Sequence, residues 1–315
     1  MNLPAESFQL ARDFLKTHAR PLERAMFEVE FEGGSAAHAL SELKRFRNED
    51  GGFGNGLEPD LTLPGSSVLA TAMGLSLLRE LGVPPHDPCV GRAVEWLVEA
   101  FDPDLAAWRS VPKQAEDHPH AAHWAWSLHR DGLRWPVGVL PRAEILAGLH
   151  RSAEFVPAEL LEEQTDRLVA DLSRSDASLG PDALVGCDLF VRTEQAPAGP
   201  REAVATMMQA LGEAMVSRDP EAWSGYVPKP LKLAPNPEAV LAKPLAAEVE
   251  RNLDYEITHQ NDDGSWSPNW SWNGAYPEAW ATAEREWRGH LTLNTLRSLA
   301  AYGRLWRYVE YRWAG

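Results

Sequence analysis

The sequence predicts an all-α protein built as a double-layered ring of about six helical hairpins, an α/α toroid. Apolar residues recur at helical spacing along most of the 315-residue chain, and no segment shows the alternation of a half-buried strand. One loop motif also occurs twice, as NEDGGF at residues 48–53 and as NDDGSW at residues 261–266. Because a repeated loop and helix unit is typical of hairpin arrays, we expect residues 1–315 to form a single domain.

The helices can be placed by their apolar periodicity and by the residues at their ends. Residues 66–81 begin with serine and are followed by Gly82, Pro84 and Pro85, the usual punctuation of a helix. The same reasoning predicts helices at residues 5–17, 36–46, 89–101, 120–129, 142–150, 157–173, 179–193, 201–217, 244–260, 289–302 and 305–312. The proline-rich segment 228–244 contains interleaved Leu, Val and Ala, which favour a packed crossover over a domain linker.

Each copy of the loop motif is followed by an irregular loop and an apolar helix that ends in glycine, Gly82 or Gly303. Asp-Gly favours a tight turn, because glycine accepts positive φ and aspartate can accept bonds from the backbone amides just ahead. We expect the aromatic residue after the turn to pack between neighbouring helices, and Gln260 to cap a helix end. The aspartates Asp50 and Asp263 are therefore interpreted as structural.

The second copy, read from Gln260 to Trp266 as Q-x-x-D-G-x-W, resembles the QW repeat of terpenoid cyclases and protein prenyltransferases. The run NEDGGFG resembles the glycine-rich form of that repeat in prenyltransferase β subunits. More narrowly, GGFGNGLEPDLTLPGSS, HPHAAHWAW and EWRGHLTLNTLRSLAAYGR resemble a bacterial family of uncharacterised toroid proteins. This resemblance implies the toroid fold. It implies less about chemistry, because the D-x-D-D and D-D-x-x-D motifs of terpenoid cyclases are absent and one fold hosts many reactions.

Composition restricts the partners. A net charge of −16 argues against nucleic acid as the partner, since phosphate binding needs a basic face. Two cysteines exclude a disulfide framework and fit a reducing cytosol, and the charged N-terminal segment is unlike a signal peptide. No apolar stretch is long enough for a transmembrane segment. We therefore expect a cytoplasmic protein with a small-molecule ligand; no motif requires a cofactor or fixes an oligomeric state.

The first candidate site is Glu58-Pro59-Asp60, in the loop before the helix at residues 66–81. Two carboxylates this close can converge on one site, where burial and mutual repulsion can keep one protonated as a general acid. Ser66 and Ser67 follow and are expected to line the same pocket. The alternative is a solvated or helix-capping pair of acids.

The second candidate is the histidine cluster His118, His120 and His123, followed by Trp124. Three histidines invite a zinc interpretation, but their spacing matches no known ligand set and no cysteine lies nearby. We therefore assign no metal site and expect His120, His123 and Trp124 to form a polar wall of a ligand cavity; the sequence alone leaves metal binding by the cluster open.

The third candidate is the tryptophan-rich region near the C-terminus, which holds many of the 13 tryptophans. Aromatic faces combined with carboxylates suit stacked sugars, or polyenes and cations held by π systems. The alternative is tryptophan packing with surface ion pairs. The residues expected to bind ligand here are Trp270, Trp272, Trp280, Glu286, Trp287 and Arg288, with Tyr276 and His290 close by.

The leading functional hypothesis is a small-molecule enzyme or binder whose aromatic-lined central cavity takes an apolar, isoprenoid-like ligand, with Glu58 or Asp60 as the acid. One alternative is a carbohydrate-active hydrolase or lyase with paired carboxylates, which in glycosidases lie about 5 to 9.5 Å apart. A second alternative is a non-catalytic scaffold, whose acids would face solvent. The sequence leaves open whether the ligand is transformed or only bound; no G-x-S-x-G, Walker, Rossmann or H-E-x-x-H motif occurs.

Overall fold

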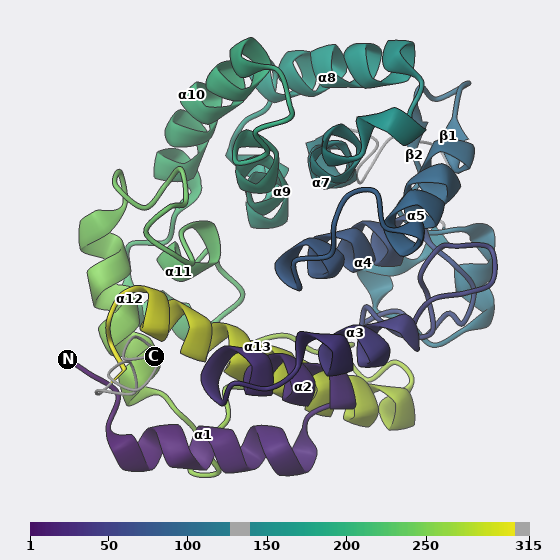
Figure 1. Ribbon diagram of the computed structural model, residues 1–315. Helices are drawn as coiled ribbons and strands as arrows, with labels where there is room; N and C mark the ends of the chain where they lie inside the picture. The colour runs from purple at the N-terminus through teal and green to yellow at the C-terminus, as the bar shows by residue number, and fades with distance from the viewer. Residues whose placement is uncertain (127–138, 306–315) are drawn as a thin grey trace. The chain divides into compact units, whose positions relative to one another are not determined.

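The structure is a computed structural model that describes residues 1–126 and 139–305. These residues form twelve α-helices and one two-stranded hairpin, so the all-α prediction is confirmed (Figure 1). The chain divides into two compact units that are interleaved in sequence. Unit 1 contains Met1–Ser35, Val216–Ser271 and Ala281–Gly315, and unit 2 contains Ala36–Met215 and Trp272–Trp280.

Unit 1 is built around two pairs of packed helices. In the first pair α1 contacts α2, where the rings of Phe8, Phe27 and Phe31 lie 5.1–6.2 Å apart. In the second pair α12 contacts α11 and the 3₁₀ turn Pro220–Ser224, whose Trp223 is buried. The bounds are α1 (Ala5–His18), α2 (Pro21–Phe31), α11 (Pro230–Leu233), α12 (Ala246–Thr258) and α13 (Pro277–Ala301), the last belonging to unit 1 from residue 281 onward.

Unit 2 contains three successive helical hairpins, α4 with α5, α7 with α8, and α9 with α10. Helix α7 packs against α4, α8 and α9, while α8 packs against α10. Helices α7 and α9 therefore lie side by side in one row and α8 and α10 in another (Figure 1). The bounds are α3 (Ala36–Lys44), α4 (Val68–Glu80), α5 (Pro88–Glu99), α7 (Val139–Arg151), α8 (Ala158–Ser173), α9 (Pro181–Val191) and α10 (Ala198–Met215).

Nine predicted helices, namely α1, α3, α4, α5, α7, α8, α9, α10 and α12, occur with ends shifted by a few residues. Helix α13 begins at Pro277, well before the predicted residue 289, because its first half is rich in Trp, Glu and Arg and carries no regular apolar stripe. Helix α2 was not predicted, although Pro21 occupies the first turn, where proline is favoured. The crossover 228–244 is packed as expected, with Leu233 and Leu241 buried.

The helix predicted at residues 120–129 is wrong over its first part. The chain there forms only the 3₁₀ turn Ala122–Trp124, and Ala125 is extended. The reason is a tertiary contact, since His120 pairs as an isolated bridge with Leu61. Residues 127–129, and 306–312 of the last predicted helix, lie outside the described residues. The sequence also predicted no strand, whereas β1 (Phe101–Asp102) and β2 (Ala107–Trp108) form a short antiparallel hairpin.

The two loop motifs fold in the same way. In each turn the first asparagine exchanges backbone hydrogen bonds with residues three and four positions later: Asn48 with Gly51 and Gly52, Asn261 with Gly264 and Ser265. The carboxylates of Asp50 and Asp263 accept the backbone N–H two residues ahead, at 3.0 and 3.2 Å. This is the turn chemistry expected of Asp-Gly.

The aromatic residue of each motif is held by a threonine on the apolar helix that follows. The backbone N–H of Phe53 donates to Thr71 Oγ1, and that of Trp266 donates to Thr292 Oγ1, both at 3.0 Å. Phe53 lies so close to Gly74 that a Cβ there would meet its ring at 2.6 Å. Each aromatic residue is therefore fastened to the helix that follows its loop.

The helices after the two motifs also end alike. Gly82 and Gly303 have φ values of 71° and 67°, and the next residue donates back to the carbonyl five positions earlier in both cases. This is the pattern of a left-handed helix terminus. The capping expected of Gln260 is wrong, because its amide donates to the carbonyls of Ser7, inside α1, and Gly264.

Candidate functional site

The Glu58-Pro59-Asp60 loop of unit 2 carries a deeply buried acid. The Asp60 side chain is almost fully buried, and its Oδ1 accepts a 2.8 Å hydrogen bond from the indole Nε1 of Trp272, which is also buried. The other carboxylate oxygen, Oδ2, lies 3.9 Å from Nε2 of His123, a side chain that is 46% exposed. Asp60 thus connects a buried indole with an imidazole that reaches solvent.

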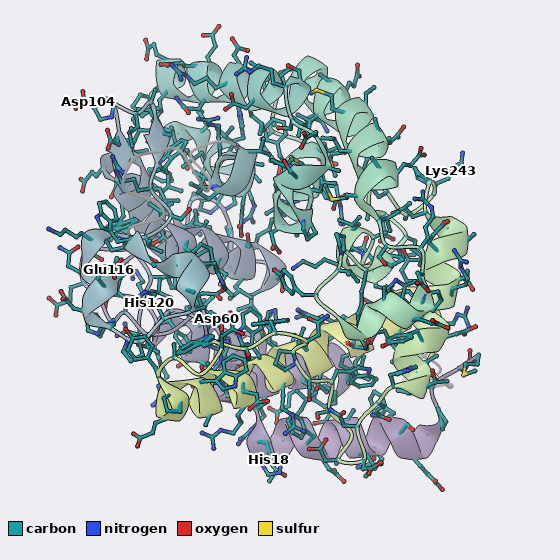
Figure 2. All side chains as sticks on the ribbon, turned by 180° about the vertical axis from the view of Figure 1, so that it is seen from behind. His18, Asp60, Asp104, Glu116, His120 and Lys243 are labelled. Atoms are coloured by element: carbon teal, nitrogen blue, oxygen red, sulfur yellow. The ribbon has the colours of Figure 1, made fainter. Side chains whose placement is uncertain are left out.

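The loop of Asp60 and the histidine segment lie side by side. The backbone of Ala121 donates to the carbonyl of Asp60 at 2.9 Å, and both the backbone N–H and the hydroxyl of Thr62 donate to the carbonyl of Pro119. Figure 2 shows His120 beside Asp60. Two of the candidate sites predicted separately from the sequence are therefore one structural site.

Aromatic rings from a third segment complete this site, which we call the Asp60 site. The ring of Trp272 lies 5.8 Å from that of Trp280 and 6.4 Å from that of Tyr276, which is 6.0 Å from His120. Tyr276 is 45% exposed and has a φ of 46°, a conformation uncommon for a bulky residue. The segment therefore carries one buried ring, Trp272, one partly buried ring, Trp280, and one exposed ring, Tyr276.

A cluster of buried apolar side chains lies next to Asp60. Leu61, Leu63, Val111 and Ala115 form a buried cluster on which Trp124 packs, and the Trp124 ring is 4.9 Å from that of His123. Glu58 is buried as well, so neither acid of the predicted pair faces solvent. Buried apolar side chains and aromatic rings therefore lie around the Asp60 carboxylate, and the Glu58 side chain is buried in the same loop.

Ser66 and Ser67, expected to line the same pocket, serve the local structure. The Ser66 hydroxyl donates to Asp50 Oδ1 at 2.8 Å and accepts from Asn48. Ser67 is the N-cap of α4, where its side chain accepts from the backbone N–H of Ala70. Both hydroxyls hold the loop motif and the helix start in place.

The remaining predicted residues lie in unit 1, around a buried ion pair. Arg20 donates two hydrogen bonds to Glu23, at 2.9 and 2.5 Å, and its Nη1 lies 3.8 Å from Oε2 of Glu286. Burial raises the pKa of Glu23, but the charge and hydrogen bonds of Arg20 outweigh it and hold that pKa below its usual value. Glu23 is therefore ionised, and Arg20 is shared between two carboxylates.

Glu286 and His290 lie one turn apart on α13, and burial shifts the pKa of each side chain. Burial raises the pKa of Glu286, against the opposing charge of Arg20. Burial lowers the pKa of His290 to about 4, although the Glu23 carboxylate opposes the shift. Asn294 lies 2.8 Å from His290 Nε2, and the neutral imidazole can accept a hydrogen bond from its amide. Perturbed groups gathered in this way are typical of functional sites, although structural ion pairs shift pKa values too.

A row of aromatic rings leads from the surface to this group. The ring of Tyr226, which is 72% exposed, lies 6.1 Å from that of Trp270, and Trp270 lies 5.0 Å from Trp287. Trp287 in turn contacts the ring of His290 at 5.4 Å. Arg288 points elsewhere, because it pairs with Asp263 and lies 4.9 Å over the ring of Phe14.

The predicted ligand-binding residues thus fall into two groups. In unit 2, contacts connect Asp60, His120, His123, Trp124, Trp272 and Trp280, and Glu58 is buried in the same loop as Asp60. In unit 1, Trp270 contacts Trp287, and Glu286 lies next to Trp287 in the chain. The sequence analysis missed Arg20 and Glu23, because α2 was not predicted. The available signal was Pro21 after Arg20, which marks a helix start and places Glu23 in the first turn.

Within residues 1–126 and 139–305, no group of three or more His, Cys, Asp or Glu side chains is arranged to hold a metal ion. No helix in the same ranges has the length and apolar character needed to cross a membrane. A comparison with protein-family models, with curated proteins and with solved structures found no match to this chain.

Proposed function

We propose that the protein binds a small, apolar, isoprenoid-like ligand at the Asp60 site, and that Asp60 acts there as an acid or base together with His123. The observation that supports this most directly is the buried Asp60 carboxylate, placed between the Trp272 indole and the half-exposed His123 imidazole. We assign to His123, whose side chain is 46% exposed, the transfer of protons between solvent and the carboxylate.

The side chains around Asp60 are mostly apolar or aromatic, which favours an apolar ligand. Leu61 and Leu63 belong to the buried apolar cluster next to Asp60. The rings of Trp272, Tyr276 and Trp280 have faces that attract hydrocarbon and positive charge. A proton given to a double bond would create positive charge beside these rings. The ring of hairpins remains part of the proposal, supported by the stacked hairpins of unit 2 and by the repeated loop motif.

A carbohydrate-active site is the second candidate, because Glu58 and Asp60 are both buried and aromatic rings also stack on sugars. A scaffold without a ligand is less well supported, since its acids were expected to face solvent and both are buried.

Tryptophan fluorescence can separate these functions. Farnesol is the apolar probe and cellotetraose the saccharide probe, each titrated into the wild-type protein. We expect saturable quenching by farnesol alone. Quenching by the saccharide alone would favour the second candidate, and quenching by neither would contradict both.

The role of Asp60 is tested by Asp60→Asn, which keeps an acceptor for the Trp272 indole but removes the charge. We expect farnesol binding within about threefold of wild type and, where mass spectrometry shows wild-type conversion of a polyene, at least about a hundredfold slower conversion. The matched control is Asp104→Asn, because Asp104 is exposed in the β1–β2 turn of the same unit (Figure 2). Equal rates in Asp60→Asn and wild type would remove Asp60 from the chemistry.

A further inference from the structure

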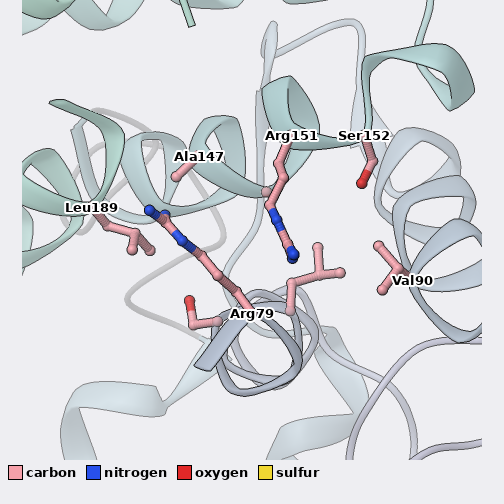
Figure 3. A pocket seen from close by; sticks show the side chains of 9 residues that line it. Arg79, Val90, Ala147, Arg151, Ser152 and Leu189 are labelled. Atoms are coloured by element: carbon pink, nitrogen blue, oxygen red, sulfur yellow. The ribbon is translucent and has the colours of Figure 1, made fainter. Parts of the chain in front are cut away.

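Unit 2 contains a small pocket at the C-terminal ends of two helices. Arg79 stands in the last turn of α4, and Arg151 is the last residue of α7. Both side chains line the pocket, together with Ser76 and Ser152 (Figure 3). Two arginine side chains therefore line one pocket in a protein whose net charge is −16.

The present partners of these arginines are all neutral. Arg79 donates to the Thr193 hydroxyl at 3.1 Å and to the carbonyl of Arg192 at 3.3 Å, and Arg151 donates to the carbonyl of Val83 at 2.7 Å. Within the part of the chain that the structure describes, neither guanidinium forms an ion pair with a carboxylate. Since each guanidinium has five N–H donors, donors remain on both.

The local electrostatics favours an anion. Burial lowers the pKa of Arg79, and the positive charges of Arg151 and Arg192 lower it further; burial also lowers the pKa of Arg151. The carbonyls at the ends of α4 and α7 supply only partial negative charge, about half a unit per helix. The carboxylates of Asp188 and Glu80 raise the Arg79 pKa, but each raises it less than either Arg151 or Arg192 lowers it. Asp188 also lies 3.5 Å from Arg192.

We propose that the pocket between Arg79 and Arg151 binds a small oxyanion, namely a phosphate or carboxylate group. The enclosed space is about 10 Å³, which is room for one water-sized group, so one oxygen of the anion enters between the two arginines. The planar guanidinium group of arginine can donate two parallel hydrogen bonds, which matches the spacing of the oxygens in a phosphate or carboxylate group. The Ser152 hydroxyl lines the same pocket and donates a 3.3 Å hydrogen bond to the carbonyl of Pro85.

The competing explanation is that the two arginines have only a structural role. On that view Arg79 and Arg151 only tie the ends of neighbouring helices together through the carbonyls they contact. Both explanations predict that removing an arginine lowers stability. They differ in whether the protein responds to added anions.

The test is isothermal titration calorimetry of the whole chain with inorganic phosphate and, separately, with acetate, at ionic strength held constant with sodium chloride. We expect one site per chain for at least one of the two anions, and the responding anion identifies the group. In Arg151→Gln and in Arg79→Gln the affinity falls about tenfold or more, because a charge-assisted pair of bonds is lost. The control is Arg167→Gln, the same change at an exposed arginine of α8, which leaves the affinity unchanged.

Two results overturn the proposal. One is that neither anion produces heat of binding with wild type at millimolar concentration. The other is that Arg151→Gln binds the anion as tightly as wild type. If the glutamine variants do not fold, Arg151→Lys keeps the charge but loses the planar guanidinium group; its anion affinity must then fall relative to wild type, and unchanged affinity contradicts the site.

Discussion

The indole N–H of Trp272 donates a 2.8 Å hydrogen bond to the Asp60 carboxylate, although the two residues are 212 positions apart. Both side chains are buried, and both belong to unit 2. The bond holds the segment Trp272–Trp280 against the loop that carries Asp60. An aromatic residue from late in the chain thereby becomes part of a site whose acid lies near its start.

Removal of the indole donor is expected to destabilise unit 2. Trp272→Phe keeps most of the ring but leaves a buried carboxylate without this donor, at a cost of about 2 kcal/mol beyond the lost ring volume. Urea unfolding measures the loss, and a double-mutant cycle with Asp60→Asn isolates the part of the interaction that depends on the charge of the carboxylate. Because the asparagine side chain is uncharged, Trp272→Phe is predicted to cost about 1 kcal/mol less in the Asp60→Asn background. Strict additivity of the two substitutions would mean that the charge of Asp60 adds nothing to the bond.

The threonines of the two loop motifs are predicted to be equivalent. Thr71→Val and Thr292→Val each leave the N–H of Phe53 or Trp266 buried without its acceptor, and each is expected to lower the free energy of unfolding by about 1–3 kcal/mol. Thr206→Val, at an exposed position of α10, is the control and should change it by less than about 0.5 kcal/mol. A loss at one threonine without a loss at the other would show that the two loops are not energetically alike.

The stability of unit 1 is predicted to fall in acid because of His290. Its pKa in the folded protein is about 4, below the unfolded value of about 6.5, so the neutral form is favoured by folding. Stability is therefore complete above pH 6.5, falls as the pH drops, and levels off below pH 4, with a total change of at most about 3 kcal/mol.

The substitution His290→Gln separates this effect from that of Glu286. The raised pKa of Glu286 acts in the opposite direction, since its contribution is present at low pH and is lost as the pH rises through the folded value. The difference in stability between wild type and His290→Gln, followed by thermal unfolding from pH 4 to pH 8, reports on His290 together with its interaction with Glu23. A difference that does not change with pH would contradict the prediction.

Gly264 lies where the loop motif 261–266 contacts α1, and we predict that a larger residue there strongly lowers stability. It has a φ of 86°, and a Cβ there would stand 2.2 Å from the backbone carbonyl carbon of Leu10. Gly264→Ala should therefore destabilise by about 3 kcal/mol or more, combining backbone strain with overpacking. The matched variant Gly274→Ala has a φ of 83° and open space around it, so about 1–2 kcal/mol is expected. Similar losses in both, measured by urea unfolding, would exclude the close approach.

Local patterns predicted much of the helical structure and little of the candidate site. Helices with a clear apolar stripe, such as α5 and α12, were found because burial of one face imposes a 3.6-residue period. The prediction did not work at residues 120–125, where the backbone of His120 pairs with Leu61 and not with its own neighbours. A pairing between distant segments cannot be recognised from the spacing of apolar residues within one segment.

The sequence by itself determined the helical class, the hairpin repetition and the turn chemistry of the two Asp-Gly loops, because each depends on residues within a few positions of one another. Only the tertiary structure decided which acids and aromatic rings meet. It brought Asp60, His123 and Trp272 together in unit 2, and Arg20, Glu23 and Glu286 together in unit 1. Such meetings depend on how helices from distant parts of the chain pack, and that is fixed by the burial of many side chains at once.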